Sequence, residues 1–559
     1  MKKKNNYFLA QTLDEIYYLE KNNKNNAICI PLNLEQLLYC KEKKIKHINP
    51  KDFLNNEFHQ KSIKISNQIA KSCKIKTNLD YNFQIEFISI LRFRINLIIF
   101  ILEVLNSLDK RFGVSKLFLS GWYEENPSSV NYYFLYRLEP VLKNLYKTKN
   151  INKKKINKKI KIFNYKIKNL KLKGNKNILL SNLGYNFSRF IFSNINQKYN
   201  YYFFANQKIS FIKKIIFRLL NLIPIYIEKI PKKNYKINNI NFKLNTKNIP
   251  SLKECLTELM NDYKIYFTDL TFYQKEIENF ISNNKLALVI TNIIKGVDGT
   301  YSNVASKYKI PTLCVSHGTV SKGFNQYDKI YKQTIAESVF SGKCSYFAVQ
   351  SKICRDSLKT HRIGGKPLYS GNLIFSENYF SKKNKKKYAL YAVTLKDISS
   401  CQVYGVDMFY EFNSNLAKLD NIAKNGGYKI VVKIHPGQIH CVSYLKNYYR
   451  NLDFKNDKID SLLKKSYALI SFSSTAIEDA LNCQIPVILL DPWKRYQHCD
   501  AERDIRKKNK SVYYVNNFQD LKTCLNNLKF GSMSDAKKYI FTGSSYSNIK
   551  NILKKIVKI

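Results

Sequence analysis

The sequence predicts an α/β protein in which two doubly wound domains face each other across a central cleft. From residue 286 onward, short apolar runs rich in Ile, Val and Leu alternate with helical patterns. Strands buried on both faces of a parallel sheet have this composition. A second series starts at residue 388, after the charged stretch 375–387 (FSENYFSKKNKKK). We therefore predict domains at 1–375 and 388–545.

The chain is long and strongly basic. Its 559 residues suffice for more than one domain, and 94 Lys and Arg against 41 Asp and Glu give a net charge of +53. An anionic partner would explain this charge, but the lysines are scattered and rise together with Asn, Ile, Tyr and Phe, which favours a compositional bias. The 12 cysteines form no CxxC pair, and the N-terminus has no uninterrupted apolar segment, so we expect a reducing, cytoplasmic location.

The first 145 residues show an α/β pattern without a recognisable chemical motif. Their most apolar window, 87–105, is interrupted by Arg92, Arg94 and Asn96, which is typical of a core helix rather than a membrane span. Strands are predicted at 27–31, 45–48 and 116–120, and helices at 35–39, 51–72 and 83–109.

Two stretches before the regular series allow alternative interpretations. The segment 142–177 is Lys/Asn-rich and of low complexity, so we expect a solvated linker, with a polyanion-binding arm as the alternative. The stretch 211–230 (FIKKIIFRLLNLIPIYIEKI) combines apolar residues with Lys213, Lys214 and Arg218. A surface helix that ends near Pro224 is the simpler interpretation, and a helix at a membrane interface is the alternative.

The remaining elements follow from the alternating pattern. The first series predicts strands at 177–181, 201–205, 286–291, 311–315, 346–350 and 367–370. It predicts helices at 251–283 and 301–308, and a further helix that follows the strand 346–350 and runs through residue 359. The second predicts strands at 388–393, 429–434, 468–472, 486–490 and 511–515, with a helix at 409–425 and another at the C-terminal end.

Three strands of the second series end in polar residues: His435-Pro436-Gly437, Ser473-Ser474-Thr475 and Asp491-Pro492-Trp493. Because ligands of open α/β sheets bind beyond the carboxyl ends of the strands, these segments predict a binding site. The small residues Ser473, Ser474 and Thr475, between a strand and a helix, would direct backbone N–H groups toward a phosphate. Glu478, one turn into the helix, would accept hydrogen bonds from ribose hydroxyls. The alternative for Thr475 and Glu478 is a capping box with a structural role. Asp491 and Trp493 would line the pocket for the nucleotide base or the sugar; the alternative is that they stabilise a turn and pack locally.

The first series supplies a facing set of candidates. His317 occupies the equivalent strand end, so His317 and His435 would bind one diphosphate from opposite walls, or one of them would act as general base. Asp298, in a glycine-containing loop, is the best carboxylate to deprotonate an acceptor hydroxyl, with a turn aspartate as the alternative. Lys322 is a candidate phosphate cation or an ordinary exposed lysine. Glu337 is a candidate acid or base, although a surface position on a helix is the simpler interpretation.

These motifs resemble known families. KIHPG followed by SSTAIEDALNCQIPVILLD resembles the nucleotide-sugar half of GT-B glycosyltransferases. His317-Gly318-Thr319 with Lys322 resembles the HGT-x-x-K segment of CDP-glycerol glycerophosphotransferases, whose HP motif and serine-rich strand end match His435-Pro436 and Ser473-Ser474. The element order over about 286–500 is also similar to UDP-N-acetylglucosamine 2-epimerase, which shares the GT-B fold. The chain departs from the epimerase pattern because Ser474-Thr475 replace its paired glycines.

The resemblance implies a GT-B-type transferase for bacterial surface polysaccharide, capsule or lipopolysaccharide. A nucleotide-sugar or CDP-alditol donor would be held by His435, Ser473, Ser474, Thr475, Glu478, Asp491 and Lys322. The catalytic groups would be Asp298, His317 and His435, and the acceptor a saccharide or a lipid-linked molecule. No DxD motif follows a predicted strand, so we expect neither a metal ion nor another cofactor.

Two other functions are considered. The first is a nucleotide-sugar 2-epimerase of the same fold. The second is a basic nucleic-acid or polyanion-binding protein, which is disfavoured because no dedicated nucleic-acid motif is found. For a transferase we expect a cytoplasmic location, with peripheral contact at the inner, anionic face of the membrane as a further option.

Overall fold

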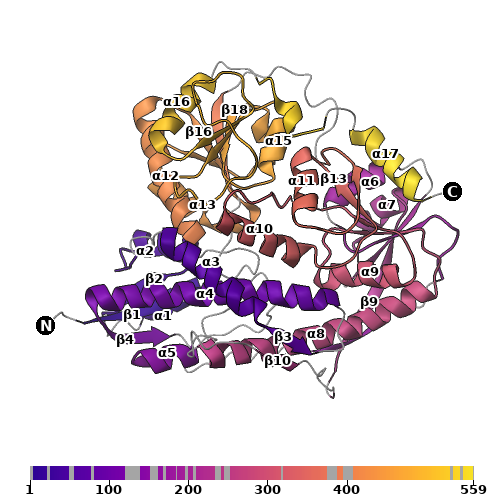
Figure 1. Cartoon of the computed structure of the whole chain (residues 1–559), viewed down its shortest axis with the longest axis horizontal. Helices are drawn as coiled ribbons and strands as arrows, with labels where there is room; N and C mark the ends of the chain where they lie inside the picture. Colours follow the sequence, from indigo (N-terminus) through magenta and orange to yellow (C-terminus); the bar gives the residue numbers. More distant parts are fainter. Residues whose placement is uncertain are drawn as a thin grey trace.

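The fold is that of a computed structural model of the whole chain (Figure 1). The described residues are 4–21, 26–49, 56–76, 81–119, 139–150, 162–167, 171–183, 185–194, 199–205, 209–232, 234, 241–243, 252–316, 319–373, 387–393, 407–528, 533–541 and 545–557.

An eight-stranded sheet carries the first regular series, in the order β14-β13-β12-β11-β7-β8-β9-β6. Its neighbours are parallel except for the antiparallel pair β6–β9. The strands are β6 (Phe163–Ile167), β7 (Asn177–Leu180), β8 (Asn200–Ala205), β9 (Leu222–Pro231), β11 (Leu288–Thr291), β12 (Thr312–Cys314), β13 (Tyr346–Val349) and β14 (Lys366–Tyr369).

Helices cover both faces of this sheet because alternate strand residues bury toward opposite sides. Ile178 and Leu180 pack with α6 (Tyr185–Ser193) and α17 (Ser545–Ile556). Leu179, between them, packs with α8 (Leu252–Ser282) and α9 (Gly296–Lys307).

A six-stranded parallel sheet carries the second series, in the order β17-β16-β15-β18-β19-β20. One face packs on α12 (Asp407–Gly426), α13 (Val442–Tyr448) and α16 (Phe518–Leu528), and the other on α14 (Ile459–Leu463) and α15 (Ala476–Asn482). The predicted α/β class with two doubly wound sheets is therefore confirmed. The strands are β15 (Tyr388–Ala392), β16 (Ile430–Lys433), β17 (Asp453–Lys455), β18 (Ser466–Ser471), β19 (Val487–Leu490) and β20 (Val512–Val515).

The first 150 residues form a separate parallel sheet of four strands, in the order β2-β1-β4-β5. The predicted strand at 45–48 is instead an isolated bridge between Cys29 and His47. The strands are β1 (Asn5–Ala10), β2 (Ile28–Pro31), β4 (Val114–Leu119) and β5 (Thr148–Asn150). The helices are α1 (Leu13–Lys21), α2 (Leu34–Glu42), α3 (Asn56–Lys71), α4 (Tyr81–Phe112) and α5 (Glu139–Leu145), and a two-stranded antiparallel ribbon joins β3 (Lys74–Lys76) to β10 (Asn241–Lys243).

The predicted domain boundary at 375–387 lies outside the described residues except for Lys387, so this division stays a prediction. The predicted low-complexity segment 142–177 contains the two short strands β5 and β6 in its described parts.

The stretch 211–230 differs from the prediction. The helix α7 (Phe211–Leu219) ends earlier, and Asn221, with φ of 52°, turns the chain into β9. Pro224 then lies in the part of β9 that pairs with β8 but not with β6. A missing N–H is tolerated where a strand is paired on one side only.

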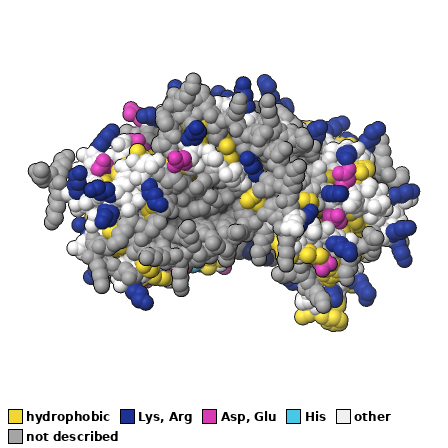
Figure 2. All heavy atoms as spheres, turned by 90° about the horizontal axis from the view of Figure 1, so that it is seen from below, with side chains coloured by type: hydrophobic (Ala, Val, Ile, Leu, Met, Phe, Trp, Pro, Cys, Tyr) yellow, Lys and Arg dark blue, Asp and Glu magenta, His cyan; other side chains and the backbone are white. Residues whose placement is uncertain are grey.

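The 32-residue helix α4 confirms the predicted core helix, and Arg94 within it is only 1% exposed. Among the described residues, no helix has the length and apolar content that crossing a membrane requires. Figure 2 shows Lys and Arg side chains spread over the described part of one face rather than gathered into a single patch.

Helix α4 also forms a hydrogen bond with the first residue of α9. The buried carboxylate of Glu86 accepts a hydrogen bond from the backbone N–H of Gly296 at 2.7 Å. Gly296 has a φ of +52°, and a Cβ placed there would lie 2.9 Å from the hydroxyl of Tyr266. This position therefore requires glycine for its backbone conformation and for space.

We expect Gly296→Ala to lower the free energy of unfolding by about 1–3 kcal/mol, since it adds left-handed backbone strain and a steric contact. Urea unfolding measures the change. Gly364→Ala is the matched control, because a Cβ there meets no atom within 4 Å and the backbone is not left-handed. It should change stability by less than about 0.5 kcal/mol. Equal losses in both variants would contradict this explanation.

Candidate active site

The carboxyl edges of the two large sheets are joined by polar contacts between the two halves of the chain. Lys332 Nζ lies 3.4 Å from Ser473 Oγ, which follows β18. Asn372, which follows β14, donates to Asp479 Oδ1 at 3.1 Å. Lys322 Nζ lies 3.1 Å from Asp500 Oδ2. Residues of the first series on α10, after β14 and near 322 thus contact residues of the second series after β18, on α15 and near 500.

Helix α10 (Gln326–Val339) lies between the three sheet units (Figure 1). Its Glu337 accepts from Arg92 of α4 at 2.6 Å, so Glu337 is held by an ion pair instead of lying free on a surface. On the other side, the Tyr331 ring packs against Tyr496 with ring centroids 5.2 Å apart. The helix begins at the N-cap Asn325, whose side chain accepts from a backbone N–H at 2.8 Å. Helix α10 is therefore held by the four-stranded unit through Glu337 and by the second half through Tyr331, while its N-terminal end is capped locally.

Lys332 is the main functional candidate that sequence reasoning missed. It is 3% exposed, and burial lowers the pKa of its ammonium group while the nearby carboxyls of Asp328 and Asp491 raise it. Burial raises the pKa of Asp328 to about 6. A signal was present in the sequence, because Asp328 and Lys332 are four residues apart on a helix shortly after the HGT segment.

The hydroxyl cluster after β18 is accessible. Ser473, Ser474 and Thr475 are half-buried, and Ser474 Oγ accepts from the backbone N–H of Ala476 at 3.2 Å. Thr475, at the N-cap of α15, makes no side-chain cap hydrogen bond. The capping box, which was the alternative interpretation of Thr475 and Glu478, is therefore not formed. Glu478 instead lies 3.5 Å from His498 Nε2.

Two other predicted donor residues lie farther along the same edge. His435 is exposed just beyond β16, which is separated from β18 by β15. Asp491 is 1% exposed, and its Oδ2 accepts from the backbone N–H of Tyr496 at 2.9 Å and from the Tyr514 hydroxyl at 3.1 Å. The guanidinium of Arg495 lies 4.8 Å from the centroid of a ring of Trp493. These contacts are those expected of the turn-and-packing alternative, and the donor-site role of Asp491 stays a prediction.

Asp298 lies at the carboxyl edge of the eight-stranded sheet, in the first turn of α9 rather than in the predicted loop. Its Oδ1 accepts from Asn182, which follows β7, at 2.9 Å. Burial raises the pKa of Asp298, and hydrogen bonds from Ser181 and Asn182 and the charge of Lys295 lower it. A raised carboxyl pKa lies closer to the working range of a general base.

His317 falls outside the described residues, but its flanks are firmly held. Gln350 Nε2 donates to the carbonyl oxygen of Ser316 at 2.6 Å. On the other side, His361 Nε2 contacts the carbonyl oxygen of Ser321 at 2.9 Å, and its Nδ1 contacts Gln333 Oε1 at 3.0 Å. Gln333 donates in turn to Glu337 at 2.9 Å. A continuous chain of contacts thus runs from α4 to the segment that carries Lys322.

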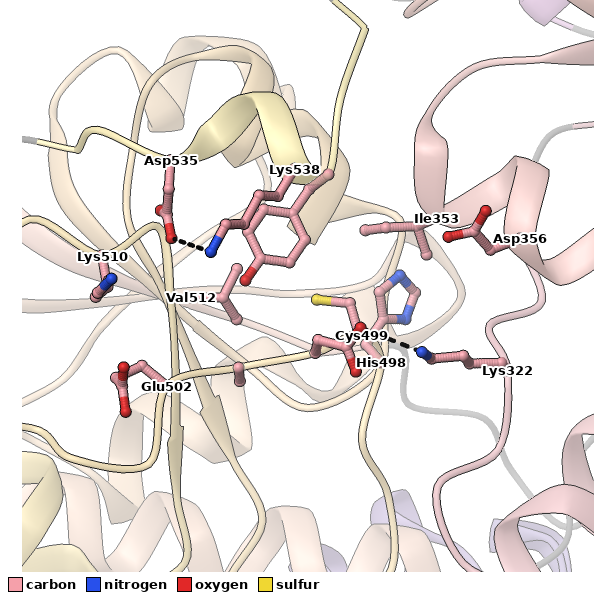
Figure 3. A pocket seen from close by; sticks show the side chains of 13 residues that line it. Lys322, Ile353, Asp356, His498, Cys499, Glu502, Lys510, Val512, Asp535 and Lys538 are labelled. Carbon is pink, nitrogen blue, oxygen red and sulfur yellow. Dashed lines mark hydrogen bonds and ion pairs between the residues drawn. The ribbon is translucent and has the colours of Figure 1, made fainter.

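A pocket of about 350 Å³ lies beside the ion pair of Lys322 with Asp500, and of the predicted site residues that the structure describes, Lys322 alone lines it. Figure 3 shows His498 and Cys499 at its centre, with Lys322 and Asp356 on one side and Asp535 on the other. Burial lowers the pKa of His498, and the Glu478 carboxylate, 3.5 Å from Nε2, raises it. The other ring nitrogen, Nδ1, has no hydrogen-bond partner among the described residues.

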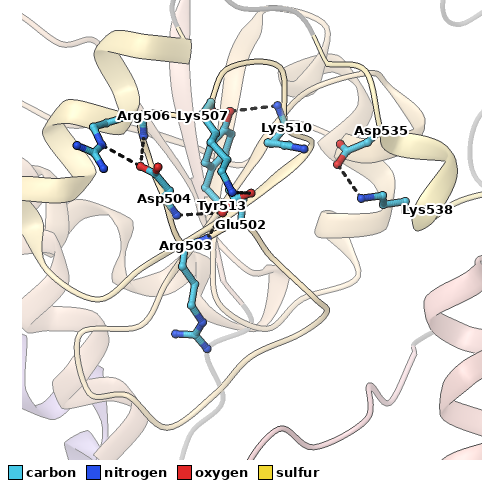
Figure 4. A network of polar contacts seen from close by, with 9 residues as sticks. All are labelled: Glu502, Arg503, Asp504, Arg506, Lys507, Lys510, Tyr513, Asp535 and Lys538. Atoms are coloured by element: carbon cyan, nitrogen blue, oxygen red, sulfur yellow. Dashed lines mark hydrogen bonds and ion pairs between the residues drawn. The ribbon is translucent and has the colours of Figure 1, made fainter.

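The outer wall of the pocket is a polar network on the 502–510 segment (Figure 4). Lys507 pairs with Glu502 at 3.2 Å, and the Tyr513 hydroxyl donates to the carbonyl oxygen of Lys507 at 2.8 Å. The backbone N–H of Lys510 donates to the same hydroxyl at 3.1 Å. These contacts fix the wall without occupying the pocket.

No family model and no curated protein matches the chain. Similar solved structures include Methanocaldococcus jannaschii UDP-GlcNAc 2-epimerase in complex with UDP-GlcNAc and UDP, at 15% identity, with a TM-score of 0.41 over 69% of this chain and 100% of the other. The Neisseria meningitidis UDP-GlcNAc 2-epimerase bound to UDP-GlcNAc is 12% identical, with a TM-score of 0.38 over 69% and 99% of the two chains. The wall teichoic acid polymerase TagF is 12% identical, with a TM-score of 0.35 over 69% and 89%. These are the kinds of enzyme that the motifs resemble.

The burial of Asp479 predicts a pH dependence of stability, which its hydrogen bond from Asn372 only partly offsets. Burial raises the pKa of Asp479 to about 7 from the ordinary value of 3.8. Between about pH 4 and pH 7 the unfolded chain therefore loses this proton while the folded chain keeps it, so folding becomes less favourable as the pH rises.

Wild type should lose roughly 2–4 kcal/mol of its free energy of unfolding between pH 4 and pH 7. The variant Asp479→Asn, whose amide oxygen can still accept from Asn372, should not show this loss. Denaturant unfolding at several pH values measures the difference between variant and wild type. Asp14→Asn, at an exposed carboxyl, should leave the pH profile unchanged. Parallel profiles for Asp479→Asn and wild type would refute the assignment.

Proposed function

We propose that the chain is a metal-independent GT-B-type transferase that takes its donor from a nucleotide-activated sugar or CDP-alditol. The observation that carries the proposal is the contact of the buried Lys332 ammonium with Ser473 at the end of β18. A cation from one half of the chain there meets half-exposed hydroxyls from the other half. Cations and hydroxyl donors at such strand ends suit a leaving diphosphate.

On the acceptor side, Asp298 is the proposed general base. It lies at the opposing sheet edge, and its raised pKa favours proton uptake from a hydroxyl. The acceptor would be a saccharide or a lipid-linked molecule. With a nucleotide sugar, direct displacement at the anomeric carbon would invert its configuration and release the nucleotide; with a CDP-alditol, the acceptor oxygen would attack phosphorus and CMP would leave. His317 and His435 are the other proposed catalytic groups, with His435 also placed on the donor side. The motif resemblance supports a role in bacterial surface polysaccharide biosynthesis.

We expect Lys332→Met to weaken donor binding at least about tenfold, because a charged hydrogen bond to phosphate is lost. Thermal stabilisation by a panel of CMP-, CDP-, UDP- and GDP-linked donors first identifies a ligand, and calorimetry then gives the Kd. Lys329→Met is the matched control, since Lys329 is exposed on the same helix α10. No stabilisation by any member of the panel, or an unchanged Kd for Lys332→Met, would sink the donor-site proposal.

We expect Asp298→Asn to lower kcat about 100-fold or more while the donor Kd stays within about twofold, because the amide keeps the shape but takes up no proton. Nucleotide release in the presence of acceptor extracts measures kcat. Analysis of the sugar product separates transfer from 2-epimerisation, which needs no acceptor. Loss of donor binding together with activity would instead assign Asp298 a structural role.

A further inference from the structure

Helix α7 presents large apolar side chains to solvent. Phe211, Ile212 and Leu219 are 77%, 71% and 73% exposed, and Ile215 and Ile216 are 49% and 48% exposed. None of its nine residues is buried. Burial of such side chains is strongly favourable, and a contiguous exposed group of them marks an interaction site.

The orientation of α7 explains this exposure. At 100° per residue, the five apolar side chains fall within an arc of about 140° on one side of the helix. Phe217 lies on the opposite side and packs on the Phe203 ring of β8, with ring centroids 5.4 Å apart. The apolar face of α7 therefore points directly away from the sheet that supports it.

Basic side chains flank this apolar face. Lys213 lies beyond one border of the arc and Lys214 and Arg218 beyond the other, and all three are exposed. The helix contains no acidic residue. Apolar residues flanked by lysine and arginine are the pattern of a helix that lies in the headgroup region of an anionic bilayer.

The neighbouring helices extend the same surface. Phe192 of α6 is 51% exposed and Tyr546 of α17 is 44% exposed, and the Tyr546 hydroxyl donates to the carbonyl oxygen of Phe192 at 3.3 Å. Lys554 and Lys555 of α17 are exposed as well. Figure 1 shows α6, α7 and α17 together at the end of the molecule that holds the C-terminus. At the right-hand end of the face drawn in Figure 2, apolar and basic side chains lie side by side, with acidic side chains among them.

We propose that α7 is a membrane-docking helix that inserts its apolar face into a bilayer containing anionic lipid. The sheet that carries it also carries Asp298, so docking would hold the proposed acceptor side at the membrane surface. The apolar face of α7 is separate from the proposed donor site, and binding to lipid vesicles requires no donor. A failure to bind vesicles would therefore leave the proposed transferase activity standing.

The test is flotation of the full chain with phosphatidylcholine vesicles that contain or lack phosphatidylglycerol. Wild type should bind the anionic vesicles. Phe211→Ser with Leu219→Ser should lower the bound-to-free ratio at least about tenfold. Lys213→Gln with Lys214→Gln and Arg218→Gln should lower it at least about tenfold on anionic vesicles, and this difference should vanish on neutral ones.

Matched controls separate α7 from the general basic charge of the chain. Lys418→Gln with Lys424→Gln and Lys446→Gln removes three exposed charges from α12 and α13, and should change binding less than about threefold. Phe112→Ser with Leu145→Ser removes two other exposed apolar side chains, and should also have little effect. Absent binding by wild type, or equal losses in controls and α7 variants, would overturn the proposal. Sedimentation that shows a dimer abolished by the Phe211→Ser and Leu219→Ser changes would overturn it in favour of a second copy as occupant.

Discussion

The contact of Lys332 with Ser473 is the interaction on which the proposed site depends. A buried ammonium group is costly unless polar partners surround it, and here they come from both halves of the chain. Ser473 lies at the end of β18, and Asp328 and Asp491 supply negative charge nearby. Helix α10 must therefore keep its register against the six-stranded sheet, and this register sets how the two sheet edges meet.

The four-stranded unit supports this arrangement from behind. Through α4, Arg92 holds Glu337 of α10, and Glu86 holds the backbone of Gly296, two residues before Asp298. Helix α4 thus contacts both α10, which carries Lys332, and α9, which carries Asp298. The first 150 residues contain no recognisable chemical motif, yet they hold the elements that present the proposed catalytic groups.

The sequence predicts those parts of the fold that a local pattern determines. Strands such as 286–291 and 486–490 are short apolar runs, and their burial on both faces leaves a clear signal. Strand β1 gives no such signal, because its apolar half follows a run of Lys and Asn, and β9 continues from a helix with the same composition. In both cases pairing with distant strands decides the structure.

The candidate site shows the same division. Residues at strand ends, such as Ser473 and Asp298, were predictable because sheet topology places them. For Lys332 the spacing from Asp328 was the one local signal, and it does not reveal the contact with Ser473; His498 has no such signal, since the role of both residues depends on which helix or loop of one unit reaches the other. Thr475 and Glu478 have the spacing of a capping box, but the spacing does not reveal that Glu478 has His498 as a neighbour.

The polar seam between the two halves has a consequence for motion. The contacts between the two large sheets include two lysines, an amide, carboxyls and a hydroxyl that would regain hydration if the sheet edges separated. Elsewhere, α2 of the four-stranded unit packs with α12 and α13 of the second half in one buried apolar cluster. Separation of an apolar interface would have no such compensation. Separation of the two sheet edges that leaves the apolar contact of α2 with α12 and α13 in place therefore costs less free energy than separation of the whole halves, which suits a site that must admit a charged molecule and release it again.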